Sequence, residues 1–372
     1  HDRVPENEVI PLASAVEFHG AIDHPELYLW DAWSSVVKDD IHLFCLAVNR
    51  ISADGERVSP ADRNYTRFHI RHFLSQDDGL TWRDMGCYQK ARIEPGHFDS
   101  GTIWSGSMLS LDNKRQLMAY TGIRNRGGAL LFQQSLGLCL SRDWTPSSEQ
   151  SGFCISDPLV ERDELTKLGY FLSDVSEMGH KDGEGEGPIM AWRDPYLLEH
   201  NGEIHLFWGA KVGEQTPALG HALLNETESG FAISKYYAPT TMPDGYQYTQ
   251  LELPKIYHDD VYDRFLMLVA SCNRLHERQS DAEADKRTRM YVAKSLTGPW
   301  EEYGHDGSVL NLAEDHMFGV TEIRIDFTKQ EMVYVAPYTE QAGAEKFLTL
   351  SKRYCLNLSE LGQPVKHSEQ GN

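Results

Sequence analysis

Leu29-Trp30-Asp31-Ala32-Trp33 stands a short turn before the apolar run Ile41–Val48. The two segments form a pattern of one strand that carries a polar group, a turn, and a second strand that is apolar. An acid between aromatic residues suits a sugar site, because the rings stack on the apolar face of a sugar while the carboxylate accepts hydrogen bonds or attacks carbon. A simpler interpretation makes Trp30 and Trp33 core residues and Asp31 the cap of a turn.

The same two-strand pattern recurs along the chain at irregular spacing. Its first strands contain five equivalent positions: Asp31, Ser105, Asp194, Glu252 and Thr321. We therefore predict an all-β fold, a five-bladed β-propeller, since a closed ring of four-stranded sheets brings every first strand to one central channel. A β-sandwich or two successive all-β domains are the alternatives, but neither gives a reason for a polar cluster at the head of each unit.

One propeller is expected to span residues 1–372. Residues 1–28 contain three prolines and only short apolar runs, so they are predicted to be a lead-in that wraps the surface. Residues 340–372 are predicted to supply a closing strand and a C-terminal tail. Residues 160–188 are rich in glycine and acidic residues and are predicted to be a long loop, of the kind that often carries sites between packed sheets.

The charge balance limits the partners of the chain. Its 372 residues carry a formal net charge of −21, from 35 Lys+Arg and 56 Asp+Glu. Such a charge disfavours nucleic acid and anionic membrane surfaces as partners and favours a neutral small molecule. No run approaches the roughly 20 apolar residues of a membrane-spanning helix, so no membrane partner is expected.

No cofactor or metal is expected either. The six cysteines form no Cys-x-x-Cys pair, and the chain has no P-loop, dinucleotide fingerprint or Gly-x-Ser-x-Gly elbow. Asp182, Glu184 and Glu186 alternate with glycine, but without the spacing of metal ligands, so they are interpreted as a solvated loop. The histidines of the predicted strands, among them His42 and His205, are interpreted as strand-surface or satisfied core groups.

Three of the equivalent positions are acids, namely Asp31, Asp194 and Glu252. Three converging carboxyls are typical of a glycosidase. One serves as nucleophile or base, one with a raised pKa protonates the leaving oxygen, and a third holds ring hydroxyls as positive charge builds on the sugar. Taken singly, Asp194 before Pro195 also fits a turn residue and Glu252 an exposed strand position.

Four motifs occur in an order that resembles the levansucrase-type glycoside hydrolases of family 68. They are Trp30–Trp33, Trp104–Ser107, Trp192–Pro195 and Gln250–Pro254, and Tyr291–Trp300 extends the match to a Ser-x-Thr-Gly-Pro strand end. The resemblance covers roughly residues 28–340. It implies a five-bladed β-propeller with a retaining mechanism that passes through a fructosyl-enzyme intermediate, and a secreted or periplasmic location.

The resemblance also implies roles for individual residues. Asp31 matches the nucleophile, Glu252 the acid/base and Asp194 the transition-state stabiliser. The matching substrate-binding positions are Trp30, Trp104 and Arg193 around the fructosyl unit, Ser105 as the hydrogen-bond donor to Asp31, Gln250 beside the acid/base, and Arg274 at the glucosyl unit and Glu252. The implied donor is sucrose or a similar β-fructofuranoside, and the implied acceptors are water or a sugar.

Two positions depart from the family pattern. Thr249 replaces an aspartate that coordinates a structural calcium in Gram-positive members, and Leu253 replaces an arginine after the acid/base. Two other functions stay open. In an inverting five-bladed enzyme on arabinosyl or xylosyl linkages, Asp31 would be a base for water. A non-catalytic sugar-binding propeller would keep only the aromatic pocket.

Overall fold

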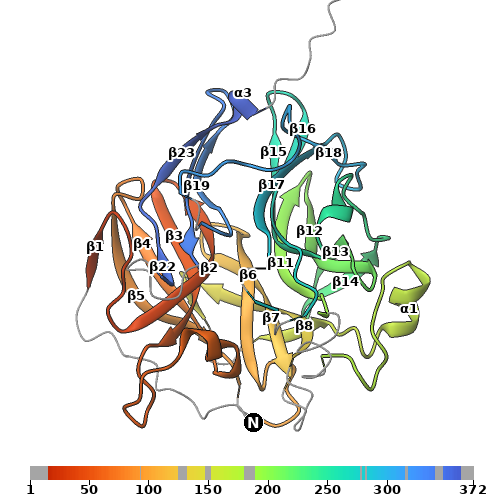
Figure 1. The fold of residues 1–372 in the computed structure, drawn as a ribbon, viewed down its shortest axis with the longest axis horizontal. Helices are drawn as coiled ribbons and strands as arrows, with labels where there is room; N and C mark the ends of the chain where they lie inside the picture. Colours follow the sequence, from red (N-terminus) through yellow and green to blue (C-terminus); the bar gives the residue numbers. More distant parts are fainter. Residues whose placement is uncertain are drawn as a thin grey trace, which may run out of the picture.

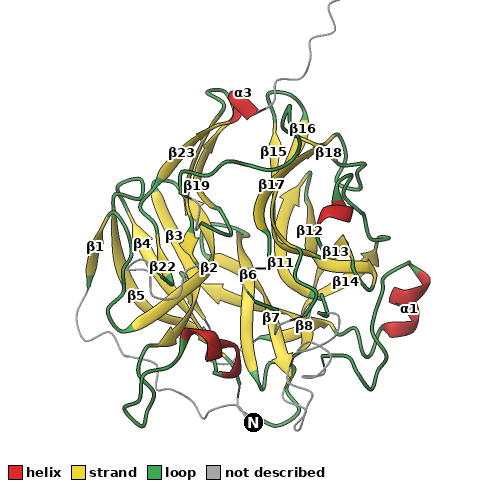
Figure 2. Cartoon of the chain, viewed as in Figure 1, coloured by secondary structure: helices red, strands yellow, loops and turns green. Residues whose placement is uncertain are grey.

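The computed structural model describes residues 16–92, 94–124, 132–146, 152–179, 189–276, 279–280, 283–314, 317–339 and 347–361. Within these residues, antiparallel sheets stand as blades around a central axis, as the ribbon and the secondary-structure colouring show (Figures 1 and 2). The predicted all-β, five-bladed propeller is confirmed.

The strands of each blade run outward from the channel. The first blade contains β2 (Leu27–Val37), β3 (Asp40–Asn49), β4 (His69–Ser75), β5 (Thr81–Lys90) and β1 (Glu17–His19). The second contains β6 (Thr102–Ser110), β7 (Arg115–Arg124), β8 (Gln133–Arg142) and β10 (Phe153–Ser156), with β9 (Thr145–Pro146) beside β8. The third contains β11 (Arg193–His200), β12 (Glu203–Gly213), β13 (Thr216–Thr227) and β14 (Gly230–Tyr236). The fourth contains β15 (Gln250–Asp259), β16 (Arg264–Cys272), β17 (Lys286–Ala293) and β18 (Glu301–Glu302). The fifth contains β19 (Thr321–Asp326), β20 (Glu331–Val335) and β23 (Tyr354–Asn357).

The first strands of the blades form the wall of the channel. β19 packs against β2, β2 against β6, β6 against β11, and β11 against β15. The hydroxyl of Tyr257 in β15 donates to Glu322 Oε2 in β19 at 2.5 Å, which links the remaining pair of blades. Residues far apart in sequence therefore meet at one place, as the repeat predicts.

Each of these five strands contains a β-bulge, seen as a register shift against its neighbour. The residues left unpaired are Asp31, Ser105, Asp194-Pro195, Leu253-Pro254 and Ile323. A bulge bends a strand and re-aims a side chain. The unit alignment is confirmed for the first three blades, whereas in the fourth the bulge directly follows Glu252 and in the fifth it lies two residues after Thr321.

The ends of the described chain join the first and fifth blades. Contrary to the predicted surface lead-in, residues 17–19 form strand β1 on the outer edge of the first blade. Ile22 is buried and forms a β-bridge with Leu350. Leu350 belongs to a small hairpin of β21 (Pro337–Tyr338) and β22 (Thr349–Leu350). Burial of the apolar Ile22 side chain stabilises the folded state. Residues 1–15, 340–346 and 362–372 lie outside the described residues.

The long loop predicted at residues 160–188 contains a short helix, α1 (Arg162–Lys167). Its Leu165 is fully buried, because the helix packs on the side of the second and third blades. Asp182, Glu184 and Glu186 lie outside the described residues. Two short 3-10 helices, η1 (Pro60–Tyr65) and η2 (Gly245–Gln247), and the final turn α3 (Leu358–Leu361) are the other helical pieces of the described chain. None of its helices is long and apolar enough to cross a membrane.

Two blades repeat a buried histidine pair. The sequence Ile-His-Leu-Phe occurs in β3 and again in β12, and His42 Nδ1 lies 2.9 Å from His72 Nε2, as His205 Nδ1 does from His221 Nε2. One ring donates to the other, so both can stay neutral. Burial lowers the pKa of His42 to about 4 and those of His72 and His221 to about 3. The histidines of these strands are therefore core groups.

These pairs predict a loss of stability in mild acid. Because the pKa of a buried ring lies below its unfolded value near 6.5, the unfolded chain binds the extra proton, and stability falls as the pH drops below about 6.5. Between pH 6.5 and pH 5, the titration of His221 should lower the free energy of unfolding by about 1.5 kcal/mol. Thermal or urea unfolding of wild type and His221→Gln across this window measures it, since the variant lacks the titrating ring. Identical pH dependence in the two proteins would contradict the prediction.

Candidate active site

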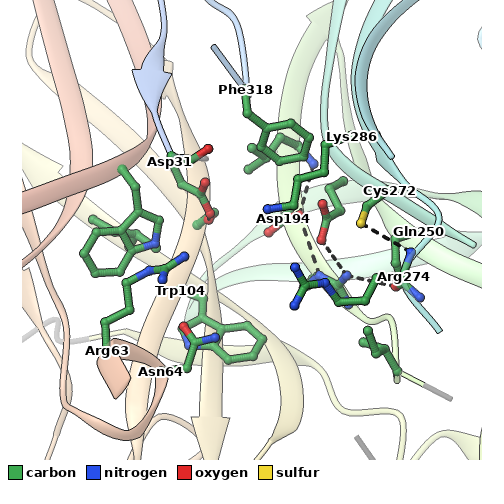
Figure 3. Close-up of a pocket in the computed structure, with 18 of the residues that line it drawn as sticks. Asp31, Arg63, Asn64, Trp104, Asp194, Gln250, Cys272, Arg274, Lys286 and Phe318 are labelled. Atoms are coloured by element: carbon green, nitrogen blue, oxygen red, sulfur yellow. Dashed lines mark hydrogen bonds and ion pairs between the residues drawn. The ribbon is translucent and has the colours of Figure 1, made fainter. Parts of the chain in front are cut away.

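All nine residues proposed from the sequence line one cavity of about 500 Å³ at the end of the central channel. They are Trp30, Asp31, Trp104, Ser105, Arg193, Asp194, Gln250, Glu252 and Arg274. Figure 3 shows the carboxyls of Asp31 and Asp194 facing the cavity from different blades, with Trp104 below them. A cavity of this size is typical of small-molecule sites.

The bulges aim the acids into the cavity. Asp31 has φ 33° and Asp194 has φ 60°, in the left-handed region that a side chain seldom adopts. Such backbone persists only where the surroundings hold it, and it occurs often at active sites. Gly106 follows the bulge at Ser105, and a Cβ there would lie 1.9 Å from the carbonyl oxygen of Ala119. Only glycine lets β6 and β7 approach so closely beside the site.

Asp31 is held by its neighbour blade. Ser105 Oγ donates to Asp31 Oδ2 at 2.6 Å, which leaves Oδ1 without this partner. Burial raises the pKa of the Asp31 carboxyl above its ordinary value, and the charge of Glu252 raises it further. The hydrogen bond from Ser105 and the positive charges of Arg63 and Lys255 lower that pKa in part. Opposed influences thus act on the pKa of Asp31, and burial is the largest of them.

Asp194 is fixed through backbone donors. Its own amide donates to Thr121 Oγ1 at 2.9 Å, and its Oδ2 accepts the amide of Leu253 at 3.0 Å. Burial raises the pKa of Asp194 to about 7, against the opposing charge of Arg193. The amide of Leu253 is available because the bulge in β15 leaves this residue outside the strand ladder. Sequence pattern alone connects neither Thr121 nor Leu253 to the acid.

Arg193 joins the third blade to the fourth. Its Nη2 lies 3.0 Å from Glu252 Oε1 and 3.0 Å from Gln250 Oε1, and its Nη1 donates to the carbonyl of Met190 at 2.6 Å. A guanidinium with several fixed acceptors is rigid. It therefore sets the position of the Glu252 carboxyl, whose side chain keeps 23% of its surface exposed. The Glu252 carboxyl is therefore accessible from the cavity.

The aromatic residues divide into two classes. Trp33 is 1% exposed and stacks on Phe44 inside the first blade, so the core interpretation is right for this residue. Trp30 and Trp104 line the cavity. Trp30 packs edge-on against Phe68 at 4.7 Å, and the guanidinium of Arg63 lies 5.5 Å from its ring. One wall of the cavity is therefore an aromatic surface that suits the apolar face of a sugar.

Thr249 positions the segment that carries Arg274. Its hydroxyl donates to the carbonyl oxygens of Cys272 and Arg274, and the Arg274 amide donates to Cys272 Sγ. A carboxylate at this position could not donate these bonds. The departure from the family pattern thus has a local structural reason. In the described part of the chain, no three His, Cys, Asp or Glu side chains are grouped so as to hold a metal ion.

Several cavity residues were not proposed from the sequence. Arg63 and Asn64 come from η1, in the connection between β3 and β4. Lys286 begins β17 of the fourth blade, and Phe318 lies in the connection that leads to β19 (Figure 3). Lys286 pairs with Cys272 in the strand register and lies 5.6 Å from the Phe318 ring. The only sequence signal for them is the presence of basic residues in the connections next to the proposed motifs. Basic residues in loops are too common for this signal to be specific.

No protein-family model matches the chain, and no curated protein matches it. Solved structures do match. Bacillus subtilis levansucrase has a TM-score of 0.63 and 16% identity, covering 90% of this chain and 84% of that one. An inulosucrase from Halalkalicoccus jeotgali bound to kestose has a TM-score of 0.58 and 18% identity, covering 90% and 82%. A levansucrase complexed with sucrose has a TM-score of 0.60 and 15% identity, covering 90% and 84%. At these identities the likeness establishes the propeller fold.

Proposed function

We propose that the chain is a retaining β-fructosidase or fructosyltransferase that acts on sucrose or a similar β-fructofuranoside. The observation that carries this proposal is the meeting of Asp31, Asp194 and Glu252, each from a different blade, in one cavity with two tryptophans. The solved structures of similar fold that contain sucrose or kestose support a sugar as the ligand.

In the first half of the reaction, Asp31 attacks the anomeric carbon of the fructosyl unit. Ser105 engages Oδ2, so Oδ1 is the oxygen that attacks. The bond from this carbon to the glycosidic oxygen breaks, and Glu252 gives its proton to that oxygen as glucose leaves. Asp194 accepts hydrogen bonds from fructosyl hydroxyls, which stabilises the positive charge that builds on the ring.

In the second half, Glu252 takes a proton from the acceptor. The oxygen of water or of a sugar hydroxyl attacks the same carbon, and the bond to Asp31 breaks, which restores the carboxylate. Water gives hydrolysis and a sugar gives transfer. Both outcomes use one intermediate, so the balance between them depends on which acceptor reaches the exposed side of Glu252.

The test is to incubate the purified protein with sucrose and quantify free glucose and free fructose over time. Equal release indicates a hydrolase, and an excess of glucose indicates transfer to sugars. A chain that releases neither sugar would contradict the proposal. Arabinosyl and xylosyl substrates, with the stereochemistry of the product, would then test the inverting alternative.

The burial of two acids predicts that the acid limb of the pH profile of kcat/KM lies at unusually high pH. Asp31 and Asp194 must be ionised in the proposed mechanism, and burial raises the pKa of both, that of Asp194 to about 7. Accordingly, kcat/KM should fall as the pH drops below about 7, whereas ordinary carboxyls would delay this fall to about pH 4. Ser105→Ala removes a hydrogen bond that lowers the pKa of Asp31, so its acid limb should move to still higher pH. Full activity of wild type at pH 5 would contradict this prediction.

A further inference from the structure

The charge balance around the cavity differs from that of the whole chain, which carries a net charge of −21. Among the described residues that line the cavity, cations outnumber acids by four to three: Arg63, Arg193, Arg274 and Lys286 against Asp31, Asp194 and Glu252. At the start of the proposed reaction the acid/base carries its proton, so four cations then face two carboxylates. The field of the whole chain favours a neutral ligand, but the balance inside the cavity favours an anionic substituent on that ligand.

Lys286 stands in one row of the fourth blade with a residue next to the acid/base. It lies opposite Cys272 in the register of β17 with β16, and Cys272 lies opposite Gln250 in the register of β16 with β15. Residues directly opposite each other share one face of a sheet, with Cβ atoms roughly 5 Å apart. Glu252 follows Gln250 by two residues, so it is on the same face of β15. Lys286 therefore reaches the cavity on the side of Glu252, where the leaving sugar lies in the proposed reaction.

Arg274 supplies a second cation on this side. It follows Cys272 by two residues, and its backbone carbonyl accepts the hydroxyl of Thr249, the residue before Gln250. Figure 3 shows the side chains of Arg274 and Lys286 directed into the cavity from this blade. The leaving-group side of the cavity thus contains two cations that a single substituent can contact.

Gln250 adds a hydrogen-bond donor beside these cations. Its Oε1 accepts from Arg193 Nη2 at 3.0 Å, which fixes the orientation of the amide group. Its Nε2 is buried, and among the described residues no atom accepts a hydrogen bond from it. A buried donor without an acceptor is costly, so this position suits a ligand that brings an acceptor oxygen. A carboxylate at position 250 would repel an anionic ligand, whereas the amide donates to it.

We propose that the leaving sugar of the donor carries a phosphomonoester, which Arg274 and Lys286 bind while Gln250 donates to an oxygen of the same unit. This inference rests on the proposed function and names its donor class, a β-fructofuranoside phosphorylated on the leaving sugar. A phosphomonoester carries a charge of about −1.5 to −2 at pH 7, which matches two cations. The transfer steps stay the same. Glu252 gives its proton to the glycosidic oxygen, and the sugar phosphate leaves with its phosphate ester intact.

The first test compares sucrose with sucrose 6-phosphate, whose phosphate is on the glucosyl unit. For wild type, kcat/KM should be about tenfold or more higher for the phosphorylated donor, because charge-assisted hydrogen bonds to phosphate are strong. Lys286→Met removes the charge at similar side-chain length. It should lower kcat/KM for sucrose 6-phosphate about 10- to 100-fold and that for sucrose less than about threefold. Lys286→Arg keeps the charge and should keep the preference.

Arg63→Met is the matched control. Arg63 is a cation of the same cavity, but its guanidinium lies 5.5 Å from the Trp30 ring, in the first blade. Its loss should change kcat/KM for the two donors by similar factors. A preference for the phosphorylated donor that Arg63→Met abolishes and Lys286→Met leaves unchanged would overturn the assignment of the phosphate to the fourth blade.

A binding measurement separates the outcomes, because it needs no turnover. In calorimetric titrations, wild type should bind glucose 6-phosphate about tenfold or more tightly than glucose, and Lys286→Met should lose this difference. Equal kcat/KM for the two donors, or equal affinity for the two glucose ligands, would overturn the inference and leave the proposed function standing. If neither donor released a sugar, the proposed function would be refuted, and the titrations would still decide whether the fourth blade binds a sugar phosphate.

Discussion

Asp31→Asn is expected to lower kcat on sucrose by about 10⁴-fold or more, since it removes the nucleophile and leaves only binding and electrostatic contributions. The substitution is the mildest one available at this position. Asparagine is isosteric with aspartate, and it tolerates the positive φ of 33° that residue 31 adopts. Steady-state kinetics with purified wild type and variant, at matched circular dichroism and melting temperature, measure the effect.

The matched control for Asp31→Asn is Ser105→Ala at the donor of the 2.6 Å hydrogen bond. It leaves the nucleophile in place and should cost far less, about 10- to 100-fold. A sugar-binding protein without catalysis would show no turnover to lose. Retention of more than a tenth of the wild-type kcat by Asp31→Asn would contradict the assignment of the nucleophile.

Glu252→Gln is expected to lower kcat on sucrose by about 10³- to 10⁴-fold, because glucose leaves poorly without a proton donor. The loss should be much smaller for β-fructofuranosyl fluoride, whose leaving group needs little protonation. Release of fluoride and of glucose, measured side by side for wild type and variant, gives the two ratios. Small anions such as azide should restore part of the second step, since they attack without a general base.

Arg193→Lys is a useful comparison for Glu252→Gln. Lysine keeps the charge but cannot hold Glu252 and Gln250 together with a planar fork. It should reduce turnover of both donors by a similar factor. If Glu252→Gln also impaired both donors equally, Glu252 would not be the acid.

The convergence of the site was predictable because each unit repeats a local pattern. A polar residue in a first strand, a turn and an apolar second strand are properties of neighbouring residues. In a closed ring, that pattern is enough to bring Asp31, Ser105, Asp194 and Glu252 to one channel. The repeat predicts the five-bladed fold and the meeting of these four residues. Trp30, Trp104, Arg193, Gln250 and Arg274 were proposed from the resemblance of the motifs to family 68, and they line the same cavity.

Other features depend on contacts that no local pattern contains. The bulge in β15 places the Leu253 amide on Asp194, and the register of β3 with β4 and of β12 with β13 creates the histidine pairs. Arg63 reaches the cavity from a connection whose path is set by the first blade as a whole. The strand formed by residues 17–19 requires an open edge on β5, which the sequence of those residues does not reveal.

The covalent intermediate is the most direct test of the account. Glu252→Gln should be mixed with β-fructofuranosyl fluoride, quenched in acid within the first turnover, digested and examined by mass spectrometry. We expect a mass gain of one fructose less one water, that is one fructosyl unit, on the peptide that contains Asp31, and no gain on the same peptide of an Asp31→Asn/Glu252→Gln variant. Fluoride release with an inverted sugar product and no labelled peptide would show that Asp31 activates water, and would contradict the retaining mechanism.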